Sequence, residues 1–172
     1  TSVRGKLPGA NGESGFQPPR LFEDQDILFI DKPAGIAVHG GTGQRVSVIE
    51  QLRLGTSGYL ELVHRLDKET SGILILAKNL ETLRKMHDSL RRPGQNSGVS
   101  KSYQTLLAGR WRGGARTLHH RLETVRGHGA TKRSRVASTG REARSIFHPL
   151  DVFQDHSLMR VELKTGRLHQ IR

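Results

Sequence analysis

The chain has 172 residues, 34% of them hydrophobic, which suffices for a sizeable core and favours one domain on length alone. Its 28 Lys and Arg residues exceed its 16 Asp and Glu residues, and the resulting +12 charge attracts polyanions such as nucleic acid. The absence of cysteine excludes disulfide scaffolds, cysteine-based zinc sites and thiol nucleophiles, and it fits a reducing cytosol. The charge indicates a partner but no reaction, because a ribosomal protein or a non-specific binder has the same excess.

The N-terminal residues and the aliphatic runs argue against a membrane protein. Residues 1–20 contain Gly, Pro, Ser and Asn without an apolar h-region, so we expect a flexible tail or linker there. The longest aliphatic run, residues 73–77, is far shorter than the roughly 20 residues that a bilayer-spanning helix needs. We therefore expect a soluble, cytoplasmic protein with no membrane partner.

The first predicted elements are a strand, a loop and a helix. Residues 27–30 form an apolar, β-prone run, and Pro33 ends it because proline cannot donate to a sheet. A Gly-rich segment follows at 35–43. Residues 47–50 (Ser-Val-Ile-Glu) then fit a capping box, which predicts a short helix.

The middle of the chain predicts two strands around a polar segment. Residues 60–63 and 72–77 are apolar runs of strand length, and the polar residues 64–71 lie between them. Asn79 is a suitable cap for a helix through about Arg91, in which apolar residues recur on one face.

The last third predicts strands at 102–108 and 157–163 after a loop at 92–101. Residues 126–135 are basic and contain glycine, so they suit an exposed hairpin or loop that touches phosphate, or simply a solvated charge run. The elements interleave without a regular βαβ rhythm. We therefore predict an α+β fold with a mixed, largely antiparallel central sheet, flanking helices and an active-site cleft.

Chemistry is best sought in residues 64–72, His-Arg-Leu-Asp-Lys-Glu-Thr-Ser-Gly, where charged and hydroxyl side chains precede a buried strand. Loops held by rigid strands are where function concentrates. From the residues alone, an ordinary turn in which Thr70 or Ser71 bonds the local backbone is the favoured interpretation.

This segment resembles the second motif of the RluA-type pseudouridine synthases, His-Arg-Leu-Asp-x-x-Thr-Ser-Gly, at every fixed position. Residues 101–103 (Lys-Ser-Tyr) are similar to the family's Lys-x-Tyr, and residues 165–172 to its Thr-Gly-Arg-x-His-Gln-Ile-Arg. Residues 32–39 fit the opening Lys-Pro-x-Gly segment, and the glycines at 40 and 41 resemble the branch that acts on large-subunit ribosomal RNA. The resemblance covers residues 21–172.

The resemblance implies an RNA-modifying isomerase that converts uridine to pseudouridine without a cofactor. It implies that Asp67 is the catalytic carboxylate, that Arg167 lies beside it, and that Tyr103 stacks on the uracil ring. It implies that Arg65 enters the RNA stack where the target base leaves. The implied partner is structured RNA, with ribosomal RNA favoured over transfer RNA, and the implied state is a monomer.

The residues alone leave other interpretations open. Tyr103 is also a suitable core residue and Arg167 a suitable surface contact to phosphate. The histidines, including the pair His119-His120, show no zincin spacing, so we predict no metal site. An inactive RNA-binding module with this fold is the main alternative function. A glycoside hydrolase would need a second acid, for which the sequence gives no argued candidate.

Two departures from the family pattern concern the ends of the chain. Family members continue beyond the position of Arg172 through further sheet and helix, so we expect residues 21–172 to be a catalytic domain truncated at its C-terminal end. Many relatives also have an N-terminal RNA-binding domain of S4 type, and residues 1–20 fit the linker that follows it.

Overall fold

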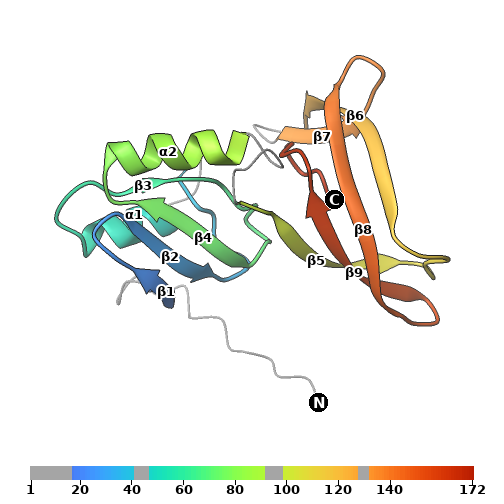
Figure 1. Cartoon of the computed structure of the whole chain (residues 1–172), viewed down its shortest axis with the longest axis horizontal. Coiled ribbons are helices and arrows are strands. Elements are labelled where there is room, and N and C mark those ends of the chain that lie inside the picture. The colour runs from blue at the N-terminus through green and yellow to red at the C-terminus, as the bar shows by residue number, and fades with distance from the viewer. Residues whose placement is uncertain (1–16, 41–46, 92–98, 128–131) are drawn as a thin grey trace. The chain divides into compact units, whose positions relative to one another are not determined.

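The computed structural model describes residues 17–40, 47–91, 99–127 and 132–172. The chain divides into two compact units, Thr1–Asp88 and Ser89–Arg172, and each has its own sheet (Figure 1). The predicted α+β class with antiparallel strands is confirmed, with the strands distributed over two sheets. Most of the predicted tail at 1–20, much of the Gly-rich segment at 35–43 and most of the loop at 92–101 lie outside the described residues.

The sheet of the first unit has four antiparallel strands in the order β1-β2-β4-β3. Their bounds are β1 Arg20–Glu23, β2 Ile27–Lys32, β3 Glu61–Leu62 and β4 Gly72–Ala77. The central pair, β2 and β4, is in register along its whole length, with Leu28 opposite Leu76 and Ile30 opposite Leu74. These four side chains are buried, so the apolar runs at 27–30 and 72–77 form the core as predicted.

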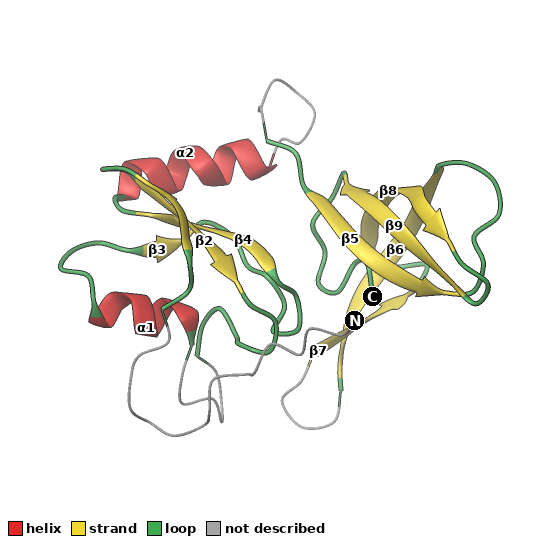
Figure 2. Cartoon of the chain, turned by 90° about the horizontal axis from the view of Figure 1, so that it is seen from below, coloured by secondary structure: helices red, strands yellow, loops and turns green. Residues whose placement is uncertain are grey.

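Two helices lie on opposite sides of this sheet (Figure 2). Helix α1, Val48–Leu54, begins after Ser47, whose hydroxyl accepts a hydrogen bond from the Glu50 N–H as the capping box predicts. Its residues Val48, Ile49 and Leu52 are buried. Helix α2, Leu80–Arg91, has no buried residue, and Asn79 caps it by accepting from the Thr82 N–H at 2.8 Å.

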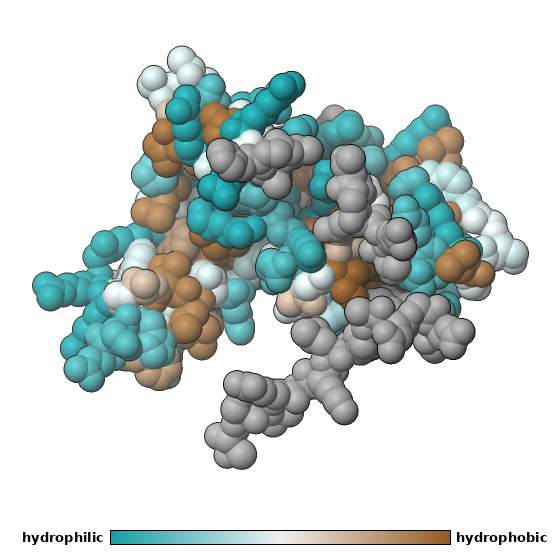
Figure 3. All heavy atoms as spheres, turned by 180° about the vertical axis from the view of Figure 1, so that it is seen from behind, coloured by the Kyte–Doolittle hydropathy of each residue, from teal (hydrophilic) through white to brown (hydrophobic). Residues whose placement is uncertain are grey.

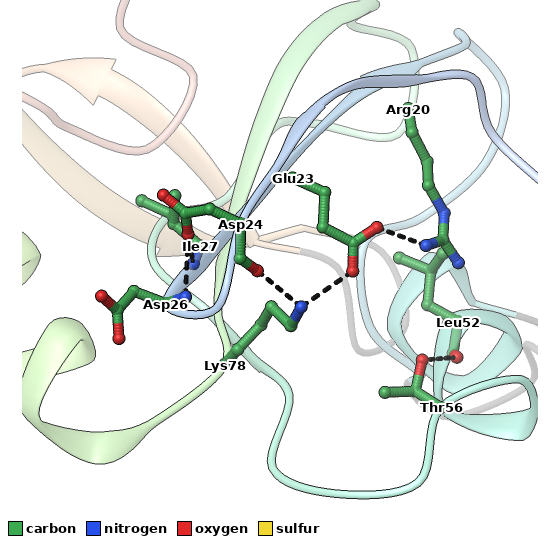
Figure 4. A network of polar contacts seen from close by, with 8 residues as sticks. All are labelled: Arg20, Glu23, Asp24, Asp26, Ile27, Leu52, Thr56 and Lys78. Atoms are coloured by element: carbon green, nitrogen blue, oxygen red, sulfur yellow. Dashed lines mark hydrogen bonds and ion pairs between the residues drawn. The ribbon is translucent and has the colours of Figure 1, made fainter.

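A polar network holds the β1–β2 hairpin to the end of β4 (Figure 4). Lys78 Nζ donates to Glu23 Oε1 at 2.9 Å and to the Asp24 carbonyl at 2.6 Å. The Asp24 carboxylate accepts from the N–H groups of Asp26 and Ile27, each at 2.8 Å, and these bonds lower its pKa. The carboxylates of Glu23 and Asp24 therefore fix the turn between β1 and β2.

The second unit contains a five-stranded antiparallel sheet in the order β5-β9-β8-β6-β7. Its strands are β5 Ser102–Ala108, β6 Arg116–Arg126, β7 Lys132–Val136, β8 Arg141–Val152 and β9 His156–Leu163. The strands predicted at 102–108 and 157–163 are confirmed. The basic segment at 126–135 belongs to the β6–β7 hairpin, in which Arg126 pairs with Lys132, and residues 128–131 lie outside the described part.

One face of this sheet forms a small core. Phe147, Met159 and Val161 are buried there, and Trp111 stacks on Phe147 with ring centroids 6.1 Å apart. Gly140 lies where the β7–β8 turn crosses β6. A Cβ at that position would come within 2.5 Å of the Leu122 backbone carbon, so the turn requires glycine.

Several large hydrophobic side chains remain at the surface. Figure 3 shows, on one face of the protein, hydrophobic side chains between hydrophilic ones. Leu54, Val136 and Leu106 are the most exposed of them, with 83%, 67% and 60% of their surface accessible. None of the helices in the described ranges has both the length and the apolar character that crossing a bilayer requires.

Candidate active site

The loop between β3 and β4 holds the predicted carboxylate. Leu66 is buried, whereas its neighbours Arg65 and Asp67 are exposed and half-buried, so the leucine fixes the loop and leaves both polar side chains accessible. The Thr70 N–H donates to the Asp67 carbonyl at 3.0 Å and closes a turn. The expectation of an ordinary turn and that of a functional loop are therefore both compatible with this geometry.

His64 fixes the start of the loop. The Val63 N–H donates to the Ile75 carbonyl at 3.0 Å, and the Ile75 N–H donates to His64 Nε2 at 3.2 Å. The imidazole thus replaces a backbone acceptor at the point where β3 leaves β4. This contact gives the imidazole of His64 a structural role at the start of the loop.

Lys32 joins the opening Lys-Pro-x-Gly segment to this loop. Because side chains alternate along β2, Lys32 lies on the same face of the strand as the buried residues Leu28 and Ile30, and its side chain is 0% exposed. Its ammonium donates to three carbonyls, of Pro33 at 2.7 Å, Ile36 at 2.8 Å and Lys68 at 3.1 Å. A buried ammonium needs such acceptors, because its water is lost.

The Lys68 carbonyl also accepts from the Gly35 N–H at 2.8 Å. Gly35 has a φ of 88°, a left-handed conformation that favours glycine, which explains its place in the segment. Burial lowers the pKa of Lys32, while the nearby carboxylates of Glu69 and Asp67 act in the opposite direction. The residue after Asp67 is therefore held by two donors from a segment more than 30 residues earlier in the chain.

The second unit holds Tyr103 and Arg167 at one end of the β5–β9 pair. Tyr103 lies in β5 opposite Val161, and the Leu163 N–H donates to the Lys101 carbonyl at 2.9 Å. Lys101 Nζ lies 3.4 Å from the position of a Cβ on Gly166, so the start of β5 adjoins the segment that contains Arg167. Burial lowers the pKa of Lys101.

The side-chain amide of Gln170 holds the segment around Arg167 through four hydrogen bonds, two to its oxygen and two from its nitrogen. Its Oε1 accepts from the Arg167 N–H and the Thr165 hydroxyl, each at 2.9 Å. Its Nε2 donates to the Arg144 carbonyl at 3.1 Å and to Ser145 Oγ at 2.8 Å. One amide therefore fastens the segment to β8.

The side chain and neighbours of Arg167 are fixed as well. Its Nε donates to the Glu142 carbonyl at 2.7 Å, and the Ser134 hydroxyl donates to the carbonyl of Leu168. His169 adopts a φ of 51°, an uncommon value for a residue with a side chain. Such a conformation persists where the surrounding bonds determine it, as they do here.

The histidines of the described ranges form no cluster with metal-ligand geometry. Within the described ranges, no group of three or more His, Asp or Glu side chains is placed to hold an ion. His119 and His120 are consecutive in β6, so their side chains project to opposite faces of the sheet.

The structure thus places the four predicted site residues in two pairs. Arg65 and Asp67 share a loop of the first unit, and Tyr103 and Arg167 share one end of the second unit's sheet. That the two pairs meet remains a prediction from the resemblance. Lys32 and Gln170 were not predicted as functional residues, although both belong to segments that the resemblance covers.

Comparison with known proteins identifies relatives of this chain. A family model described as RNA pseudouridylate synthase matches residues 26–172. The ribosomal large subunit pseudouridine synthase C of Pasteurella multocida is 37% identical over 164 residues, which are 94% of this chain and 49% of the relative. The protein of that name from Escherichia coli strain K12 is 38% identical over 154 residues, 88% of this chain and 47% of the relative. The chain therefore spans about half the length of these relatives.

Solved structures show the same fold at low sequence identity. Human RNA pseudouridylate synthase domain containing 4 superposes with a TM-score of 0.70, covering 90% of this chain and 62% of its own. Human RNA pseudouridylate synthase domain containing 1 superposes with a TM-score of 0.73, covering 97% of this chain and 66% of its own. Both are 22% identical to this chain.

Proposed function

We propose, from the premise that this chain belongs to the RNA pseudouridylate synthase family, that it isomerises uridine to pseudouridine in structured RNA. The names of its relatives favour large-subunit ribosomal RNA as the substrate. The observation on which the proposal depends is the loop of Asp67, a half-buried carboxylate beside buried Leu66 in a loop held by Lys32.

The chemistry of the reaction requires a carboxylate in such a place. Pseudouridine forms when the bond from uracil N1 to the sugar breaks, the base turns within the site, and its C5 joins the same sugar carbon. Positive charge develops at the anomeric carbon during this exchange, and an ionised carboxylate stabilises it. Asp67 must be ionised in each of the three possible mechanisms, in which it attacks the sugar, attacks the base or removes a sugar proton.

The other three residues have roles that suit their side chains. The guanidinium of Arg167 beside Asp67 would keep the carboxylate ionised and fix its orientation. Tyr103 would stack on the uracil and relay a proton through its hydroxyl. Arg65, exposed on the same loop as Asp67, would fill the gap that the base leaves in the RNA helix.

The proposed reaction needs no cofactor, because the uracil that leaves the sugar carbon through N1 rejoins the same carbon through C5. The hydrogen on C5 is lost to water and N1 gains a proton, so neither an oxidant nor a group donor is required. We expect the protein to act as a monomer in the cytoplasm, where ribosomal RNA is made and modified in bacteria.

Release of tritium from RNA labelled at uracil C5 tests the function, because the new bond to the sugar replaces that hydrogen. The full-length protein, rather than residues 1–172 alone, should release label from a large-subunit ribosomal RNA fragment in proportion to the pseudouridine formed. Tight RNA binding by the full-length protein without any release would identify it as an inactive RNA-binding module instead.

A further inference from the structure

The charge of the chain is divided unequally between its two compact units. Ser89–Arg172 contains 17 Lys and Arg residues and 5 Asp and Glu residues, whereas Thr1–Asp88 contains 11 of each sign. The second unit therefore has the whole formal excess of +12, and the first unit, which contains Asp67, is neutral. Attraction of a polyanion depends on this excess, so it originates in the second unit.

Within that unit, cations concentrate on two paired strands. We call residues 121–126 of β6 and 132–136 of β7 the basic hairpin. It contains one acidic residue, Glu123, which forms an ion pair with Arg135 at 3.0 Å. Its five cations are all exposed: Arg121, Arg126, Lys132, Arg133 and Arg135.

The strand register distributes these cations over both faces of the hairpin. Arg126 lies opposite Lys132, and one residue along, Val125 lies opposite Arg133. Because side chains alternate in a strand, Arg133 and Arg135 project from one face while Arg126 and Lys132 project from the other. A ribbon with cations on both faces can contact the phosphates of the two strands that border a groove of a duplex.

A simpler explanation is that charges protect the edge of a sheet from pairing with another chain. Strand β7 is an edge strand, so this explanation covers its three cations. It does not cover Arg121, which lies in the part of β6 that pairs with β7 through Leu122 and with β8 on its other side. The opposite edge strand, β5, has no charged residue, so charge is not a general feature of the edges of this sheet.

We propose that the basic hairpin is the docking element for the sugar-phosphate backbone of folded, double-stranded RNA. The neutral first unit then supplies the proposed carboxylate but little of the electrostatic attraction. The partner is the RNA of the proposed function, on which this inference rests. The inference adds the part of the protein that holds the RNA and the double-stranded form in which the RNA is held.

The test compares two double variants that remove equal charge. Arg126→Gln with Arg133→Gln neutralises the hairpin on both faces, and Arg84→Gln with Lys85→Gln removes two exposed charges from α2 in the neutral unit. The affinity of the full chain for a stem-loop RNA is measured over a range of salt concentrations. The hairpin variant should lose about two from the slope of log affinity against log salt, about one for each lost phosphate contact, and the α2 variant none.

Two further measurements keep the result interpretable. Arg126→Lys with Arg133→Lys preserves the charge and should preserve the salt slope, which excludes misfolding as the cause of any loss. An unstructured RNA of equal length should lose less affinity than the stem-loop when the hairpin is neutralised. Equal slopes for the two charge-removing variants, or equal losses on both RNAs, would overturn the proposal while leaving the enzymatic function intact. Failure of the wild-type chain to bind either RNA would instead refute the proposed function itself.

Discussion

Replacement of Lys32 by methionine tests whether the buried ammonium holds the Asp67 loop. Methionine has a similar length and fills the same row of the core, but it cannot donate a hydrogen bond. The carbonyls of Pro33 and Ile36 then lose the donor they have here, whereas the Lys68 carbonyl keeps the Gly35 N–H. The substitution therefore removes one of the two bonds that hold the residue after Asp67.

The size of the effect follows from opposing contributions. Two buried carbonyls left without a donor cost about 1–3 kcal/mol each, and the third lost bond adds to this. The substitution also removes a charged ammonium that burial disfavours, as its lowered pKa indicates, and this offsets part of the destabilisation. We expect Lys32→Met to reduce the free energy of unfolding by about 2–4 kcal/mol.

Urea unfolding of the full chain measures this difference through the midpoint and slope of the transition. Lys85→Met is the matched control, because Lys85 pairs with Glu81 at 2.6 Å on the exposed face of α2. An exposed i,i+4 pair of this kind contributes little to stability, because solvent screens it. If Lys32→Met destabilised the protein no more than Lys85→Met does, the ammonium would not hold the loop.

Three other predictions follow from the same contacts. Burial lowers the pKa of Lys32 in the folded protein below the value of 10.5 that it has in the unfolded chain. At a pH between the folded and the unfolded pKa, the unfolded state binds more protons than the folded state, so the free energy of unfolding increases with pH there. The difference in unfolding free energy between wild type and Lys32→Met should therefore grow from neutral pH toward 10.5, and a constant difference would contradict the burial. Gln170→Glu replaces the Nε2 donor by an oxygen facing the Arg144 carbonyl, so it should cost about 1–3 kcal/mol and slow turnover by displacing Arg167. Thermal unfolding and tritium release check this, and wild-type values in both would disprove the holding role. Arg65→Ala should slow the reaction on a folded stem-loop more than on a single strand, because only the stem-loop must be unstacked; equal losses would count against that role.

Apolar runs and caps were sufficient to predict much of the fold. The runs at 72–77 and 102–108 are strands β4 and β5 with the predicted bounds, and Asn79 caps α2 as expected. Residues 126–135 were predicted only as an exposed hairpin or loop, and part of them is the β6–β7 hairpin. Strands β6 and β8 were otherwise missed, because their outward positions hold arginine and histidine and the inward positions of β8 include the small residues Ala143 and Ser145. Alternation without an apolar run gives a weak signal.

The site residues were predicted by resemblance, whereas the residues that hold the site segments in place, Lys32 and Gln170, were not predicted. Asp67 and Arg167 stand at fixed positions of family motifs, whereas the roles of Lys32 and Gln170 depend on bonds to residues far away in the chain. Lys32 reaches a carbonyl 36 residues later, and Gln170 reaches one 26 residues earlier. Local patterns carry no information about such contacts, because only the folded sheets bring these groups together.

Tritium release by Asp67→Asn is the most direct test that Asp67 is the catalytic group. Asparagine has nearly the same shape as aspartate but lacks the negative charge and the basic lone pair that every candidate mechanism requires. With RNA labelled at uracil C5, the full-length wild-type protein should release label to water, and the full-length Asp67→Asn variant should release almost none while binding the RNA with unchanged affinity. Release by Asp67→Asn at a rate near that of the wild type would contradict the role of Asp67 and the enzymatic function built on it.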